Sequence, residues 1–222
     1  MTHEEILRAL RTFSACNLSD ALDRLGLAGA PHGLHPLWAG CGRIAGRAMT
    51  LKLIPAGADS PVDGTLRAIS AADPGDVLVI DHGGSVEVNS FGGIAAFTAQ
   101  RRGLVGVIID GVTRDVDEMR DLGFPVYGRG VIQQSIRNRC AFGGFGGEIQ
   151  IAGVPVRRGD HVVADENGVV VVPERSAEEV VDMARLSFDR EEQIKRWIAE
   201  GVDPVEAHQR LHYDTLTGGE KG

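Results

Sequence analysis

The sequence predicts an α/β protein with a central βαβ unit, a β-rich second half and a long C-terminal helix. Two apolar runs, 76–81 and 104–109, indicate buried parallel strands on either side of a glycine-opened helix. Short apolar runs separated by glycine turns fill residues 131–172, which is typical of a compact β-layer. Helical spacing then extends over 176–200.

The elements before the βαβ unit are two helices, a strand and a third helix. Residues 3–12 have helical spacing, and a second helix over 17–26 ends at a glycine. A loop rich in glycine, proline and histidine continues to about Gly40. Residues 47–54 alternate as a strand does, and 61–72 suit a helix because a proline stands in the first turn.

The helix inside the βαβ unit is expected to begin with a cap at Asn89 or Ser90 and to end at Gly103. Gly92 and Gly93 would let a ligand approach the backbone, and the free amides of a helix N-terminus bind anions. The alternative is that these glycines only allow close packing of helix against strand. A right-handed crossover places the loops after both strands at the same end of the sheet.

Arg114 and Asp115 follow the second strand of this unit and are the main candidate site residues. Ligands of open α/β sheets bind beyond the carboxyl ends of the strands. Arginine holds a carboxylate with a planar fork of donors, and aspartate is a hard oxygen ligand for Mg²⁺ or Mn²⁺. The alternative is a strand-end turn in which Asp115 caps the next helix, over 116–122.

The second half is predicted to be made of short strands and turns. Gly143–Gly147 lacks the spacing of a dinucleotide fingerprint and indicates a flexible turn, and Asp165–Gly168 indicates a hairpin turn rather than a metal site. A polar tail follows Leu216. We expect one domain over 1–222, with about 174–222 as a helical extension. The strands are expected near 125–127, 131–132, 148–151, 154–156, 161–164 and 169–172.

Composition limits the possible partners. The chain has 222 residues and a formal charge of −8, without a basic run, so nucleic acid is not expected to bind. No signal pattern and no apolar stretch of membrane-spanning length is present, so we expect a cytoplasmic protein without a membrane partner. The three scattered cysteines indicate reduced thiols. The histidines lack metal-site spacing, and His82, at a strand end, is either functional or structural.

Several ordered blocks of the sequence resemble one family over most of the chain, the 4-hydroxy-4-methyl-2-oxoglutarate / 4-carboxy-4-hydroxy-2-oxoadipate aldolases. That family is similar to the regulator of ribonuclease activity A and to proteins labelled demethylmenaquinone methyltransferases. The most specific blocks are 74–79 and 103–115. The other matching blocks are Ser19–Leu22 with Gly26, Gly46–Thr50, Arg158–Asp165 and Gly168–Pro173.

The resemblance implies a compact α/β fold of the swivelling β/β/α type. It also implies a homotrimer or a dimer of trimers, with active sites between subunits. By this resemblance, Arg114 binds and polarises the pyruvyl part of a small 2-oxo acid, and Asp115 holds a divalent metal, Mg²⁺ or Mn²⁺. Glu191 and Asp20 match acids that reach the site of a neighbouring subunit.

The resemblance further implies that the start of the βαβ helix takes the substrate carboxylate. The backbone residues concerned are Gly92, Gly93, Ile94 and Ala95. The family often has an acidic residue where this chain has Gly93, and this departure bears on metal affinity and activity.

The function implied is that of a class II aldolase that releases pyruvate and also decarboxylates oxaloacetate, because both reactions pass through the pyruvate enolate. No lysine lies in either site loop, which argues against a Schiff-base aldolase. The alternative is a non-catalytic regulatory binding protein resembling the regulator of ribonuclease activity A, although that relative lacks the aspartate after the arginine. A methyltransferase is not favoured, because no glycine loop follows the first strand.

Overall fold

Four parallel strands form the centre of a nine-stranded sheet, as expected for the βαβ region. They are β2 (Ile44–Ile54), β3 (Val77–Asn89), β4 (Gly106–Thr113) and β5 (Val126–Gly128). The structure is a computed structural model, and it describes residues 1–55 and 59–211. The polar tail predicted after Leu216 lies outside the described residues.

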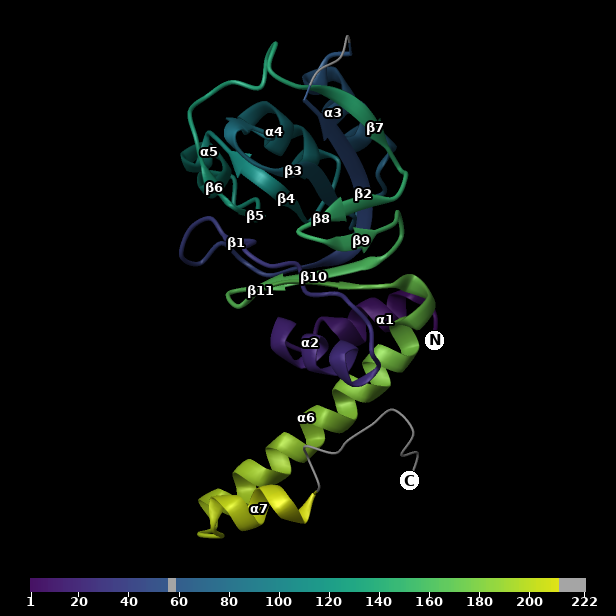
Figure 1. Cartoon of the computed structure of the whole chain (residues 1–222), viewed down its shortest axis with the longest axis vertical. Coiled ribbons are helices and arrows are strands. Elements are labelled where there is room, and N and C mark those ends of the chain that lie inside the picture. Colours follow the sequence, from purple (N-terminus) through teal and green to yellow (C-terminus); the bar gives the residue numbers. More distant parts are fainter. Residues whose placement is uncertain (56–58, 212–222) are drawn as a thin grey trace.

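Shorter antiparallel strands extend this sheet on both sides. The main path has the order β1-β5-β4-β3-β2-β10-β11, and it curls into a nearly closed barrel (Figure 1). β6 pairs with the end of β4, β7 pairs with β2, and β8 and β9 form a separate hairpin. The bounds are β1 His35–Pro36, β6 Gly130–Val131, β7 Ala141–Phe145, β8 Ile149–Ile151, β9 Val154–Val156, β10 His161–Asp165 and β11 Gly168–Val172.

The helices lie in two groups on opposite sides of β10 and β11 (Figure 1). One group, α3 to α5, packs on the parallel strands, and the other contains α1, α2 and the long α6. The bounds are α1 His3–Leu10, α2 Ala15–Arg24, α3 Pro61–Ala71, α4 Gly93–Arg101, α5 Val116–Asp121, α6 Ala177–Ala199 and α7 Pro204–Arg210, with a 3-10 turn at Glu174–Ser176.

Three buried apolar clusters follow from the alternation of side chains along the strands. Val162 and Val171 point into the barrel, whereas their neighbours Val163 and Val170 pack against α1, α2 and α6. The third cluster lies between the parallel strands and α3 to α5. Because β10 and β11 are covered on both faces, they are buried at nearly every position.

The ends of β3 and β4 are fastened together where the site was expected. Arg114 N and Thr113 Oγ1 both donate to the Phe91 carbonyl, at 3.3 and 2.8 Å. The parallel register pairs Asp81 with Asp110, and α4 forms the crossover between the two strands. The loop after β4 therefore lies beside the start of α4, as the βαβ prediction requires.

The structure corrects three local predictions. β3 continues to Asn89, and the helix cap is Gly92 rather than Asn89 or Ser90, with no side-chain hydrogen bond. Gly143 and Gly144 belong to β7 rather than to a turn. Gly143 lets β7 approach β2 closely, since a Cβ on Gly143 would lie 2.9 Å from Ile54 Cγ2. The sequence analysis also did not predict α7.

The Asp165–Gly168 segment forms the expected hairpin turn between β10 and β11, where the Asn167 amide donates to Asp165 Oδ1 at 2.9 Å. No helix within residues 1–55 and 59–211 has the length and apolar content needed to cross a membrane.

Candidate active site

A cavity of about 330 Å³ opens where β3 and β4 end and α4 and α5 begin. Its wall contains the backbone of residues 92–95 and the side chains of Arg114, Asp115 and Glu118. Val62 and Ile136 add apolar surface to the same cavity. The structure thus brings together the two sequence-predicted loops and adds Glu118, which the sequence analysis did not identify.

Asp115 adopts a left-handed backbone conformation, with φ of 59° and ψ of 37°, immediately before α5. Non-glycine residues rarely adopt this conformation, and such strain is often found at functional sites. Asp115 is the N-cap residue of α5, as the alternative expected, but its side chain makes no capping hydrogen bond. Instead, Asp115 Oδ2 accepts a hydrogen bond of 2.9 Å from the Gly93 amide.

Gly92 and Gly93 make room for carboxylates of the chain itself. A Cβ on Gly92 would lie 2.8 Å from Asp115 Oδ2, and a Cβ on Gly93 would lie 1.9 Å from Glu118 Oε2. The Glu118 carboxylate thus occupies the space that a side chain at position 93 would need. Its spacing of three residues from Asp115 at a helix start could have indicated this proximity.

The start of α4 presents free amides to the cavity. Gly92 provides no side-chain cap, and the Gly93 amide is already bonded to Asp115. The amides of Ile94 and Ala95 therefore lack an intrahelical acceptor, as the first amides of any helix do. With the positive end of the helix dipole, they form a site suited to a carboxylate.

Arg114 faces this anion site from the other loop. Its side chain is 37% exposed, and its Nε lies 3.3 Å from Asp115 Oδ2 as an ion pair. That nitrogen is buried without a hydrogen-bond partner. Its terminal guanidinium nitrogens bond to no other residue within the described part of the chain. A half-buried guanidinium whose terminal nitrogens are unbonded and lie beside a cavity is suited to a planar carboxylate or keto acid.

The oxygen donors fit a hard divalent cation that keeps part of its water shell. Asp115 Oδ1 and the Glu118 carboxylate have no partner among the described residues. No group of three or more histidine, cysteine, aspartate or glutamate residues within 1–55 and 59–211 could hold a metal. Mg²⁺ commonly binds through one or two carboxylates and several waters, so two carboxylates are sufficient for such an ion.

A family model described as RraA-like, Aldolase/RraA, matches residues 15–171, a range that includes every residue lining this cavity. The chain belongs to the RraA-like family.

Two curated relatives align with nearly all of this RraA-like chain. Protein DlpA of Legionella pneumophila is 30% identical over 214 residues, covering 96% of this chain and 35% of its own length. This chain therefore spans about a third of DlpA.

The second relative is a protein of Halalkalibacterium halodurans, named provisionally as a 4-hydroxy-4-methyl-2-oxoglutarate aldolase. It is 30% identical over 204 residues, covering 92% of this chain and 93% of the relative. This relative thus matches the RraA-like chain over nearly its whole length.

Solved structures confirm the fold. An uncharacterized protein of Pseudomonas syringae pv. tomato superposes with a TM-score of 0.86 at 31% identity, covering 94% of this chain and 95% of that one. Streptomyces coelicolor RraAS2, described as an unusual member of the RNase ES inhibitor RraA family, gives a TM-score of 0.79 at 28% identity, covering 88% and 97%.

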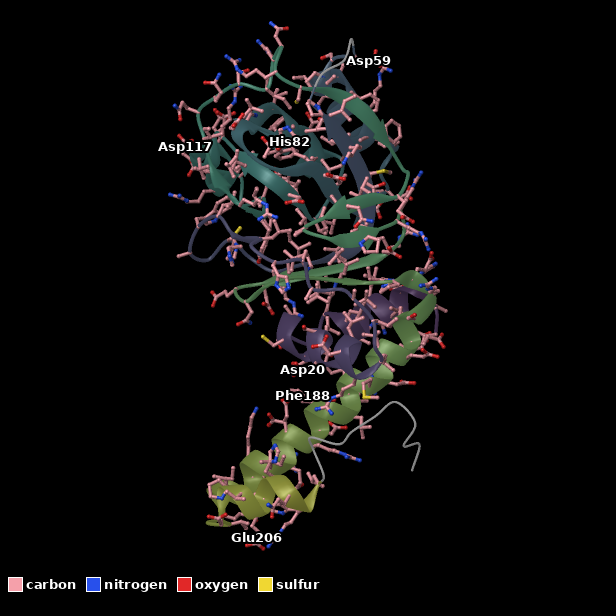
Figure 2. The ribbon with its side chains drawn as sticks, in the orientation of Figure 1. Asp20, Asp59, His82, Asp117, Phe188 and Glu206 are labelled. Atoms are coloured by element: carbon pink, nitrogen blue, oxygen red, sulfur yellow. The ribbon has the colours of Figure 1, made fainter. Side chains whose placement is uncertain are left out.

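Asp20 and Glu191 are not at this cavity in the RraA-like chain. They lie on α2 and α6, across β10 and β11 from α4 and α5 (Figures 1 and 2). Burial, and then the negative charge of Glu191, raise the pKa of Asp20. This effect shows that the two acids lie close to each other. Whether they serve a neighbouring subunit therefore stays a prediction.

Proposed function

We propose that this chain is a divalent-metal-dependent, class II aldolase that cleaves a 4-hydroxy-2-oxo acid to pyruvate. The observation that carries the proposal is the convergence of Arg114, two carboxylates and the uncapped start of α4 on one cavity. These groups suit a 2-oxo acid bound beside a hard cation. Two relatives that carry the name 4-hydroxy-4-methyl-2-oxoglutarate aldolase support the same substrate class.

The residues suggest how the substrate is held. The amides of Ile94 and Ala95 would bind its C1 carboxylate, and Arg114 would donate to its 2-oxo oxygen. Negative charge develops on that oxygen when the C3–C4 bond breaks, so a donor aimed there stabilises the transition state. Asp115 and Glu118 would hold Mg²⁺ or Mn²⁺, which when bound supplies Lewis-acid polarisation of the same oxygen.

The same arrangement supports decarboxylation of oxaloacetate. Loss of carbon dioxide from that acid leaves the enolate of pyruvate, whose charge lies on the oxygen that Arg114 faces. No lysine of the described residues lines the cavity, so a Schiff base with the substrate is not favoured. One cavity can therefore serve both pyruvate-forming reactions.

The test is pyruvate release from 4-hydroxy-4-methyl-2-oxoglutarate and from oxaloacetate, with protein first stripped by EDTA. We expect little activity without metal, recovery with Mg²⁺ or Mn²⁺, and no recovery in Asp115→Asn, which keeps the size of the side chain and removes its charge. Full activity in excess EDTA would show that the metal mechanism is wrong. No pyruvate from either substrate with metal present would contradict the aldolase itself.

The alternative function is that of a non-catalytic regulatory binding protein. The similarity to RraAS2 supports it. In that case, neither metal nor any 4-hydroxy-2-oxo acid would give turnover, and Arg114 and Asp115 variants would leave partner binding unchanged.

A further inference from the structure

A second, larger cavity of about 710 Å³ lies next to the candidate active site. Residues 134–140 line both cavities, with Gln134 on one side and Ile136 on the other. Asn89 fixes this segment with two hydrogen bonds. Its backbone amide donates to the Gln134 carbonyl at 3.0 Å, and its side-chain Oδ1 accepts from Ile136 N at 2.7 Å. The two cavities are therefore separated by a thin wall rather than by a full layer of core.

A buried polar pair crosses this wall. His82 lines the larger cavity, Ser90 lines the site cavity, and His82 Nδ1 lies 2.6 Å from Ser90 Oγ. His82 is 9% exposed and Ser90 is 3% exposed. Figure 2 shows His82 in the interior of the sheet-containing part of the molecule.

The pair is held tightly against the neighbouring strand. The Ser90 amide donates to the Val112 carbonyl at 2.8 Å, which fixes the backbone on β4. A Cβ on Gly111 would lie 2.8 Å from Ser90 Oγ and 3.2 Å from His82 Cβ. The space above Gly111 is thus filled by the two side chains, and neither can turn away without leaving a gap.

The surroundings keep His82 in its neutral form near neutral pH, so Nδ1 can act as an acceptor. Burial lowers its pKa below the usual value, against the opposing effect of Asp81 and Asp110. When Nε2 carries the ring hydrogen, Nδ1 accepts from the Ser90 hydroxyl, and the lone pairs of Ser90 Oγ remain free for another donor. The charged groups around His82 are Asp81 on β3, Asp110 on β4, Lys52 on β2, and Glu87 and Arg139 at the cavity wall.

We propose that Ser90 and His82 form a proton relay that removes the 4-hydroxyl proton of the substrate during aldol cleavage. The inference rests on the proposed aldolase function, which assigns no protein base to this step. Ser90 Oγ takes the substrate proton while its own proton passes to His82 Nδ1, and the C3–C4 bond breaks to give a carbonyl product and the pyruvate enolate. The relay then runs in reverse and returns the proton to C3, so protons balance. Ser90 contacts the substrate, and His82 acts through it.

The first experiment measures kcat and KM for aldol cleavage in Ser90→Ala, with Ser85→Ala as the matched control. Ser85 lines only the larger cavity. General-base catalysis contributes about 10²–10⁴-fold, so kcat should fall by about that factor while KM changes little. The ratio of aldol cleavage to oxaloacetate decarboxylation should fall as well, because decarboxylation releases no hydroxyl proton. The acidic limb of the kcat/KM profile, which reports protonation of His82, should disappear.

The second experiment uses chemical rescue. His82→Ala empties a position that opens into the larger cavity, so added imidazole should restore aldol cleavage with saturation, and should not rescue Ser90→Ala. Wild-type protein without any metal-dependent pyruvate release overturns the proposed function. Active wild-type protein with an unchanged pH profile in Ser90→Ala, or a folded His82→Ala without rescue, overturns the relay alone.

Discussion

At the residue scale, the site depends on how closely two carboxylates approach the start of α4. Gly92 and Gly93 leave this backbone bare, and Asp115 and Glu118 fill the space. Glu118 thus brings a carboxylate into the space beside position 93, where the sequence resemblance led us to expect an acid. The space that a side chain at position 93 would occupy is filled by the Glu118 side chain from α5.

The first prediction concerns metal affinity. Glu118→Gln keeps the size of the side chain and removes its charge, so we expect Mn²⁺ to bind at least tenfold more weakly. Asp117→Asn is the control, because Asp117 is exposed, does not line the cavity and lies at the edge of the molecule (Figure 2). Titration of stripped protein followed by Mn²⁺ electron paramagnetic resonance measures both. Equal affinities in the two variants would exclude Glu118 as a ligand.

The second prediction concerns Arg114. Arg114→Lys keeps a positive charge and loses the planar fork. If the guanidinium acts on the developing enolate oxygen, kcat should fall at least as much as KM rises. Steady-state kinetics of pyruvate release provide the measurement, and a change confined to KM would mean that Arg114 only binds the substrate.

At the element scale, β10 lies between the barrel interior and the helices α1, α2 and α6. Its first residue, His161, is fully buried, and neither ring nitrogen has a hydrogen-bond partner within the described residues. The His3 ring on α1 lies 6.1 Å away. Burial, and then the charge of His3, lowers the pKa of His161 to about 4. The folded protein therefore holds this imidazole in its neutral form.

The third prediction follows from this pKa. The unfolded chain protonates His161 near its usual value, so stability is lost as the pH falls below about 6.5 and continues to fall towards 4. Between pH 7.5 and 5, His161 should account for about 2 kcal/mol of lost stability, at about 1.4 kcal/mol per pKa unit. Urea denaturation of wild type and His161→Asn at both pH values measures it. Parallel losses in the two proteins would contradict the assignment.

At the scale of the whole molecule, two features motivate the prediction that the site is shared with another subunit. Ile94 and Phe97 on α4 are 74% and 53% exposed, which is unusual for large apolar side chains beside a cavity. The second half of α6 extends away from the barrel with α7 (Figure 1). Glu191 lies on this part of α6 and cannot reach the Arg114 cavity of its own chain.

The fourth prediction is a homotrimer, or a dimer of trimers, in which Glu191 reaches the site of a neighbour. Asp115→Asn and Glu191→Gln subunits are mixed after each is shown to be inactive alone. Each shared site needs one intact loop and one intact helix, so about a quarter of the sites in a random trimer should recover. Light scattering gives the assembly state. A monomer at micromolar concentration, or no recovery in verified mixed trimers, would count against a shared site.

The sequence by itself determined most elements and the main loops of the candidate site. The period of the apolar residues separates strands from helices, and the glycines at 103 and 123 mark where helices end. The sequence also predicted the βαβ unit, so Arg114 and Asp115 could be placed beside the start of α4. These features depend on local backbone preferences and on the handedness of one crossover.

Only the tertiary structure decided which distant side chains meet. The Glu118 carboxylate beside Gly93, the His82–Ser90 pair above Gly111 and the proximity of Asp20 to Glu191 all join separate elements. The continuation of β3 to Asn89 and the pairing of β7 with β2 likewise depend on neighbouring strands. Such contacts depend on how elements pack in three dimensions. Periodicity along one chain does not specify the distance between side chains on separate elements.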